Sequence, residues 1–297
     1  MTDMSLLHNT VIGVDGSPGS QLALAWAVAQ ADGGEVTAVH AIPPLPSVLA
    51  AFVLVNLDNL RAEHRRMLEG EWIATAVEAG AVIDPVLVDD NPAAALRSVA
   101  KRKGDVPIVI GFQESGRWSR HHVGDVANRL LHYADVPLIM MAEQSEARAL
   151  AGTIVVGVHG LVTASHEPIV WATQLATERS LAIHIVSVNQ PPILTAGYGY
   201  PADLYEADIN AVHQANVNTT NALVETLRAE NPDVSVTCET LEGHPTTMLS
   251  EAINELDPAL VIIGNYHHTK LTSIATDSVG RHLPTMVRCP VAAIPAE

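Results

Sequence analysis

The sequence predicts an α/β protein made of two doubly wound, five-stranded parallel sheets. Three observations support this prediction: an ordered internal repeat, an alternation of strand and helix patterns, and an aliphatic composition with only 4% aromatic residues. The segment GVDG at 13–16 returns 144 residues later as GVHG at 157–160. Further pairs, in the same order along the chain, are Trp26-Ala27 with Trp171-Ala172, Asn91-Pro92 with His244-Pro245, Ile110-Gly111 with Ile263-Gly264, and Asp135–Leu138 with Arg288–Val291.

Length and composition set the broad class of protein. A chain of 297 residues that repeats once contains two domains of ordinary size, which we place at residues 1–146 and 147–297. The formal charge of −17 repels nucleic acid and anionic lipid, so we expect neither as a partner. Two cysteines fit neither a disulfide framework nor a zinc site, and no apolar run approaches ~20 residues. We therefore expect a cytoplasmic protein without a membrane span.

The elements of the first copy follow from local patterns. The β-branched run Thr10–Val14 predicts a buried strand, and Ser17 before Pro18 predicts a helix start that extends to about Gln30. Strands are then expected at Glu35–Ala41, Val82–Val88, Val106–Gly111 and Pro137–Met141, and helices at Leu57–Ala79, Pro92–Lys103 and Val123–Tyr133. Alternation of this kind is typical of a parallel, doubly wound sheet.

The second copy repeats this pattern, with strands expected near 153–158, 182–188, 234–240, 259–264 and 291–294. The polar, short segment Gln144–Gly152 is the expected linker, so the two domains should pack against each other. No helix follows the final strands Pro137–Met141 and Val291–Ile294, which makes them edge strands. Because open apolar edges promote aggregation, we expect these two strands to pair with each other or across a homodimer.

Ligands of an open parallel sheet bind beyond the carboxyl ends of the strands, where the winding direction reverses. In the first copy those ends are Asp15, His40-Ala41-Ile42 and Gly111 with the loop that follows it. The two copies diverge at these positions, since His159 replaces Asp15. The difference suggests that the two domains do not bind the same ligand equally well.

These residues together resemble the universal stress protein family in its tandem two-domain form. The resemblance rests on the first strand ending Gly-Val-Asp-Gly-Ser, the second ending Val39-His40-Ala41, the fourth ending Ile110-Gly111, and the final Val-Pro-Leu-Ile strand. It implies Rossmann-like UspA domains of the adenine nucleotide alpha hydrolase type, with strand order 3-2-1-4-5. It also implies a stress-response protein that binds ATP or another adenine nucleotide and has no established catalytic activity.

By this resemblance, the nucleotide site of the first domain uses the ends of strands one, two and four and the start of the following helix. The site residues implied are Val14, Asp15, Gly16, Ser17, Ala41, Gly111, Arg117, Arg120, Gly124, Asp125 and Val126. Asp15 would meet the ribose or the adenine, and the backbone of Ala41 would meet the adenine edge. The glycines would let backbone N–H groups approach the phosphates.

The phosphate motif of the family is altered in both copies. In the first copy Glu114 stands at the second glycine and Asp125 at the Ser/Thr position; the second copy reads Gly264, His267, Asp277 and Ser278. A carboxylate ~4 Å from a phosphate repels it by about 4 kcal/mol at an effective dielectric constant of 20. The cationic residues of the first loop that would offset this are Arg117, Arg120, His121 and His122. The alternative is a solvated basic loop at a domain interface.

Three interpretations of function stay open at this point. The first is a regulatory binding module, not a metabolic enzyme, whose altered adenine-nucleotide site lies in the first domain. The second is a degenerate member that binds no nucleotide and acts through protein contacts, and the third is a slow ATP hydrolase with no nameable catalytic residue. Metal binding is not expected, because neighbouring histidines such as His121-His122 point about 100° apart on a helix and form a poor chelate.

Overall fold

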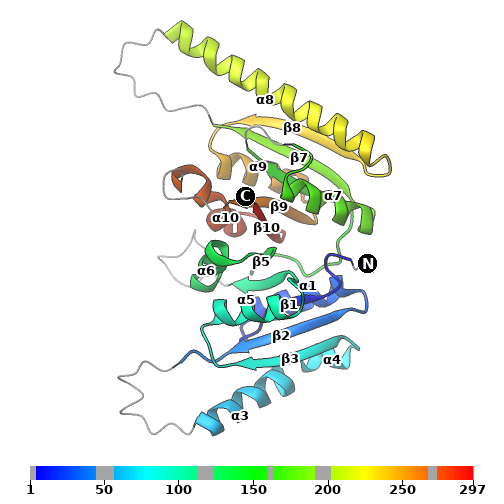
Figure 1. Ribbon diagram of the computed structural model, residues 1–297, viewed down its shortest axis with the longest axis vertical. Coiled ribbons are helices and arrows are strands. Elements are labelled where there is room, and N and C mark those ends of the chain that lie inside the picture. Colours follow the sequence, from blue (N-terminus) through cyan, green and yellow to red (C-terminus); the bar gives the residue numbers. More distant parts are fainter. Residues whose placement is uncertain are drawn as a thin grey trace.

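Ten strands of the chain form one sheet, in the order β3-β2-β1-β4-β5-β10-β9-β6-β7-β8. The computed structural model describes residues 5–44, 57–112, 124–159, 163–190, 202–266 and 273–296. Each half of the sheet is parallel and has the expected order 3-2-1-4-5, counted within its own copy. The prediction of two five-stranded, doubly wound units is therefore confirmed, and the structure adds that the two sheets are continuous (Figure 1).

The strands of the first unit lie close to their predicted positions. They are β1 Thr10–Gly13, β2 Glu35–Ala41, β3 Val82–Val88, β4 Ile108–Phe112 and β5 Leu138–Ala142. The side chains of Val11 and Ile12 on β1 and of Ile108 and Val109 on β4 are fully buried. Burial on both faces explains why these strands read as continuous aliphatic runs and not as alternating patterns.

The helices of the first unit are α1 Pro18–Ala31, α3 Leu57–Met67, the π-helical turn η1 Leu68–Trp72, α4 Ala74–Glu78, α5 Pro92–Arg102 and α6 Asp125–Tyr133. The Ser17 side chain caps α1 by accepting the Ser20 N–H, as the sequence predicts. The single helix predicted over Leu57–Ala79 is wrong in its middle. There the Ile73 N–H donates to the Leu68 carbonyl, five residues back, and this π-type bond divides the helix.

The second unit repeats the arrangement with β6 Thr153–Val158, β7 Ala182–Asn189, β8 Val236–Glu242, β9 Leu260–Tyr266 and β10 Val291–Ala296. Its helices are α7 Glu167–Arg179, α8 Ala202–Glu230, α9 Pro245–Leu256 and α10 Ser273–Met286. Helices α3 and α8 lie at opposite ends of the long axis, and both chain ends lie near its middle (Figure 1). Within the described part of the chain, no helix has the length and apolar character of a membrane span.

The two tryptophans paired in the sequence repeat are not structural equivalents. Both are buried, as expected for core residues. Helix α1 ends at the left-handed Asp32, six residues after Trp26, whereas α7 ends at the left-handed Ser180, nine residues after Trp171. The tryptophans thus occupy different turns of matching helices, and their match in sequence is a coincidence of residue type.

The two halves of the sheet join through the final strands. Strand β10 pairs with β5 in the antiparallel direction, with Val291 opposite Met140 and Ala293 opposite Leu138. The expectation that these strands pair with each other is therefore confirmed. A homodimer through the same edges is wrong for this structure, because the pairing makes both strands interior and leaves β3 and β8 at the ends of the sheet.

Polar contacts also hold the units together, and Gln30 at the end of α1 lies at their centre. Its Nε2 donates to the Trp26 and Arg148 carbonyls at 3.1 and 3.0 Å, and its Oε1 accepts the Leu150 N–H at 3.0 Å. Arg179 on α7 donates to the Gln30 carbonyl at 2.6 Å. These contacts tie the linker to both units, so the expected packing of the domains is observed.

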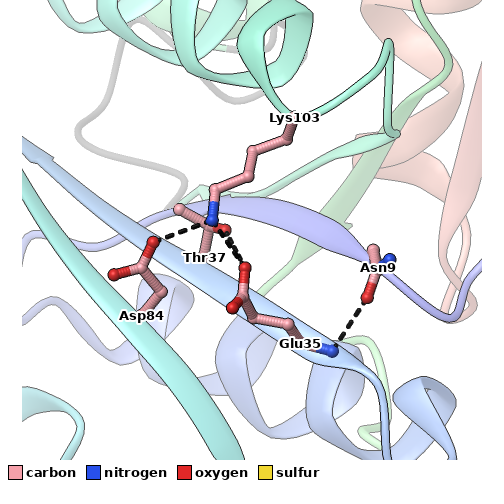
Figure 2. Close-up of polar contacts among 5 residues, drawn as sticks. All are labelled: Asn9, Glu35, Thr37, Asp84 and Lys103. Carbon is pink, nitrogen blue, oxygen red and sulfur yellow. Dashed lines mark hydrogen bonds and ion pairs between the residues drawn. The ribbon is translucent and has the colours of Figure 1, made fainter.

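A second polar cluster lies at the amino end of the first half-sheet, away from the carboxyl strand ends (Figure 2). Lys103, directly after α5, places its Nζ 2.6 Å from Glu35 and 2.9 Å from Asp84. The Glu35 backbone N–H donates to Asn9 Oδ1 at 2.9 Å, and the Thr37 hydroxyl donates to the Glu35 carboxylate at 3.5 Å. Lys103 thus ties α5 to β2 and β3, which is a structural role.

Candidate functional site

A cavity of ≈ 370 Å³ lies at the carboxyl ends of β1, β2 and β4, where the winding direction reverses. The elements around it are the β1–α1 turn, the end of β2, the start of α5, the end of β4 and the first turn of α6. Its lining residues are Gly13, Val14, Asp15, Ser17, Ser20, Val39, His40, Ala41, Pro92, Leu96, Ile110, Gly111, Phe112, Gly124, Asp125, Val126 and Ala127. The cavity therefore occupies the position at which open parallel sheets bind ligands.

The turn after β1 holds the Asp15 carboxylate at the opening of this cavity. Its Oδ1 accepts the Ser17 N–H at 3.0 Å, and the Asp15 N–H donates to the Ser20 hydroxyl at 3.4 Å. Burial opposes ionisation of this carboxyl, but the hydrogen bonds from Ser17 and Ser20 and the nearby His40 outweigh it. The pKa of Asp15 therefore lies below its ordinary value, and the group is a carboxylate at neutral pH.

Two glycines allow α1 and β4 to meet backbone to backbone beside the cavity. A Cβ added to Gly111 would overlap the Gly19 carbonyl, and a Cβ added to Gly19 would lie 3.1 Å from the Phe112 nitrogen. At position 111 only glycine permits so close an approach, whereas a side chain at position 19 would require a small shift of the neighbouring backbone. Gly111 is thus required by helix–strand packing, whatever ligand the cavity holds.

Helix α6 presents its first turn to the same cavity. Gly124 is the N-cap residue, and Asp125 is the first helical residue. A carboxylate at this point complements the positive end of the helix dipole, so Asp125 stabilises α6. It also occupies the kind of position at which a phosphate would bind. A Cβ at Gly124 would meet no described atom within 4 Å, in contrast to Gly111.

The structure brings most of the predicted site residues together. Val14, Asp15, Ser17, Ala41, Gly111, Gly124, Asp125 and Val126 all line the cavity. Gly16, at φ +79°, lies beside it with the Trp72 indole packed against its backbone. Arg117 and Arg120, together with Glu114, His121 and His122, lie outside the described residues.

The sequence analysis named His40 only as a strand end, yet its imidazole lines the cavity and is buried. Its Nδ1 donates to the Val14 carbonyl at 2.8 Å, and its Nε2 lies 2.7 Å from Nδ1 of His64 on α3. Burial lowers the pKa of His40, and the neighbouring His64 lowers it further, against the opposing effects of the Val14 carbonyl and Asp15. The available sequence signal was a histidine between Val39 and Ala41, next to the carboxyl end of strand β2.

The matching cavity of the second unit is much smaller, ≈ 80 Å³. Its walls are mainly apolar and include Pro168 and Ile169 from the start of α7. His159, in place of Asp15, donates through Nδ1 to the Val188 carbonyl at 3.2 Å. The strand register makes Val188 the equivalent of Ala41. The His159 imidazole therefore already uses the Val188 carbonyl, the backbone acceptor at this strand end. His267 and the Asp277 and Ser278 side chains lie outside the described residues.

The described part of the first cavity presents several hydrogen-bonding groups. It offers two carboxylates, backbone groups at strand ends, two serine hydroxyls and an imidazole, on mostly apolar walls. Among the described residues, no three His, Cys, Asp or Glu side chains gather as metal ligands do.

Comparisons with known proteins agree with this architecture. Universal stress protein Rv2623 of Mycobacterium tuberculosis is 25% identical over 306 aligned positions, which cover 95% of this chain and 94% of that protein. A universal stress protein from Archaeoglobus fulgidus superposes with a TM-score of 0.66 at 16% identity, covering 97% of this chain and 98% of the other. The protein PA1789 from Pseudomonas aeruginosa, described as functionally unknown, has a TM-score of 0.59 at 13% identity and coverages of 97% and 92%.

A universal stress protein family member from Arabidopsis thaliana, solved with AMP bound, covers 50% of this chain and 93% of its own, at 14% identity and a TM-score of 0.30. That score is too low for its AMP site to be transferred to this chain. The protein-family comparison is more direct, since the Universal stress protein family matches residues 7–141 and again residues 151–295. The chain therefore belongs to the universal stress protein family and carries two of its domains in tandem.

Proposed function

We propose that this protein is a regulatory binding module of the stress response whose first-unit cavity binds one adenine nucleotide. The observation that carries the proposal is the cavity itself. Its ≈ 370 Å³ falls within the range of about 300–1,000 Å³ usual for small-molecule sites, whereas the ≈ 80 Å³ of the second unit does not. Of these two strand-end cavities, as the described residues line them, the one in the first unit therefore fits a nucleotide better, and we expect one ligand bound at the strand ends per chain.

The polar groups of the first cavity suit the uncharged end of a nucleotide. The Asp15 carboxylate can accept hydrogen bonds from ribose hydroxyls or an amino group, and the Ala41 backbone at the end of β2 can meet a planar base edge. The mostly apolar walls, which include Leu96 and Ile110, can enclose the base. Resemblance to the nucleotide-binding members of the family supports the same arrangement.

Carboxylates near the phosphate position set the expected ligand preference. Asp125 lies at the start of α6 and repels a phosphate there. Each added phosphate increases this repulsion unless Arg117 or Arg120 offsets it. We therefore expect AMP and ADP to bind at least as well as ATP.

Calorimetric titration of the full-length protein with adenosine, AMP, ADP and ATP tests the proposal. We expect a stoichiometry of one, and an Asp15→Asn variant that binds about 10- to 100-fold more weakly, as for loss of a hydrogen bond to a charged group. Asp32→Asn is the matched control, because Asp32 is a carboxylate at the far end of α1, where asparagine tolerates the left-handed backbone.

Absence of binding by all four ligands would refute the proposal and favour a member that acts through protein contacts. Two equal sites per chain would refute the assignment to the first unit. Release of phosphate from ATP with magnesium, at a rate above the protein-free background, would show a hydrolase in place of a binding module.

A further inference from the structure

A pair of histidines joins helix α3 to the wall of the first-unit cavity. His40 on β2 and His64 on α3 have ring planes 16° apart and ring centroids 4.9 Å apart, with 2.7 Å between Nε2 of His40 and Nδ1 of His64. A centroid distance nearly twice the nitrogen–nitrogen distance means that the rings lie in line, joined through an N–H···N bond, and not face to face. The pair is thus a hydrogen-bonded unit.

The hydrogen-bond partners fix where the protons lie. The Val14 carbonyl can only accept, so Nδ1 of His40 carries a hydrogen. In neutral His40 the Nε2 atom then has a lone pair, and Nδ1 of His64 must donate to it. Nε2 of His64 remains as the atom that can take up a proton while both hydrogen bonds persist. A proton on Nε2 of His40 keeps the pair only if His64 changes to the tautomer with its hydrogen on Nε2, and it places the positive charge on the buried ring.

The packing around the pair favours this order of protonation. The Trp72 ring covers His40 edge-on, at a centroid distance of 4.8 Å and an angle of 67°, and the same indole packs against Gly16. Burial lowers the pKa of His40, so the His40 ring is the less favourable place for a positive charge within the pair.

Other charges near the pair are largely neutralised or negative. The arginines of α3 are committed to carboxylates, in the pairs Arg61 with Asp58 and Asp89, Arg65 with Glu69, and Arg66 with Glu71. On the cavity side the charged groups are Asp15, which acts on His40, and Asp125 across the cavity. No lysine or arginine lines the described part of this cavity. A proton on the histidine pair is therefore a source of positive charge that the described wall otherwise lacks.

We propose that His64 is a positioning residue that makes the first-unit cavity select anionic ligands in a proton-dependent manner. Through His40 it holds the Val14–Asp15 turn, and when protonated it places one positive charge behind the cavity wall. The inference rests on the proposed nucleotide site. In the second unit the strand register puts Ser187 at the position of His40, so that unit lacks the equivalent imidazole.

The binding test compares ADP with adenosine, which shares the base and ribose but has no charge, at pH 8 and pH 6.5. His64→Asn keeps an N–H at the Nδ1 position and cannot titrate, so it should bind ADP like the wild-type protein at pH 8. On lowering the pH, we expect ADP affinity of the wild type to rise about three- to tenfold relative to His64→Asn. Dividing the ADP affinity of the wild type by that of His64→Asn at each pH removes the effect of the titration of ADP itself. Adenosine should show no such difference, and His8→Asn, at the amino end of β1, should behave as wild type.

Equal pH dependence of ADP binding in wild type and His64→Asn would overturn the inference while leaving the nucleotide site intact. If neither ligand binds at any pH, the proposed function fails, and imidazole ¹⁵N chemical shifts of the ligand-free protein decide the inference separately. We expect Nε2 of His64 to take up a proton as the pH falls while Nε2 of His40 stays an acceptor. Protonation of His40 first, or independent titration of two unpaired rings, would refute the pair.

Discussion

Replacement of Gln30 by methionine should weaken the junction between the two units. Gln30 is 1% exposed, and its side chain makes three hydrogen bonds: two donated by Nε2, to the Trp26 and Arg148 carbonyls, and one accepted by Oε1 from the Leu150 N–H. Methionine matches its length but forms none of these bonds. The buried Leu150 N–H and the Arg148 carbonyl then lose their partners in the linker.

The magnitude follows from the groups left unpaired. Each buried orphan costs about 1–3 kcal/mol, and burial of the thioether in place of an amide returns about 1 kcal/mol. We expect a net loss of about 2 kcal/mol in the free energy of unfolding, which corresponds to a fall in Tm of about 3 °C for a chain of 297 residues.

Two measurements check this expectation in the full-length protein. Thermal or denaturant unfolding gives the loss of stability, and hydrogen exchange at the Leu150 amide reports the local effect. Gln21→Met, on the same helix, is the matched control, because its side chain makes no hydrogen bond to another described residue. Gln30→Glu adds a second test: it keeps the acceptor for Leu150 but directs a carboxylate at two carbonyls, so its instability should shrink as the pH falls and the carboxyl becomes protonated.

The reasoning would be refuted if Gln30→Met unfolded within about 0.5 kcal/mol of the wild type and retained Leu150 amide protection. It would also fail if Gln21→Met caused the same loss, since the effect would then come from methionine on this helix and not from the junction.

Three further predictions concern charge, packing and thiol chemistry. Lys103→Met should lower the free energy of unfolding by only about 1 kcal/mol, because its partners Glu35 and Asp84 are partly exposed. These carboxylates raise the pKa of Lys103, so the stabilisation is present below the ordinary lysine pKa and is lost as the pH rises through the raised value. Unfolding of Lys103→Met and of the control Lys101→Met across that pH range would check this. Gly111→Ala should lower the stability by more than about 2 kcal/mol, because the alanine Cβ would overlap the Gly19 carbonyl. Gly124→Ala should change the stability by under about 1 kcal/mol, because its Cβ would meet no described atom. Equal losses in denaturant unfolding would contradict the packing argument. Burial raises the pKa of Cys289 to about 12, so a disulfide reagent should modify this thiol only after unfolding. The partly exposed Cys238 should react first. Rapid modification of both thiols in the native protein, counted by mass spectrometry, would disprove this.

The sequence by itself determined the elements and their order. Strands β2 and β3 lie at the predicted residues because a run of β-branched side chains bounded by polar residues has few alternatives to a buried strand. The start of α1 was equally local, since Ser17 and Pro18 act on the first turn that they belong to. The repeat then extended one unit to the other. The rule for strand ends pointed to Asp15, Ala41 and Gly111. The resemblance to the family supplied five more residues that line the cavity, namely Val14, Ser17, Gly124, Asp125 and Val126.

Only the tertiary structure decided how the units meet and which side chains complete the site. An apolar edge strand can pair equally well with a second copy or with its own chain, so the sequence could not choose between them; the linker and the Gln30 contacts place β10 beside β5. His40 and His64 lie 24 residues apart, and their bond depends on how α3 packs over the end of β2. The size of each cavity likewise depends on how helices pack at the strand ends, and the smaller one is lined by Pro168 and Ile169 from the start of α7. Local sequence patterns record propensity and burial, whereas these features arise from contacts between segments that are distant in the chain.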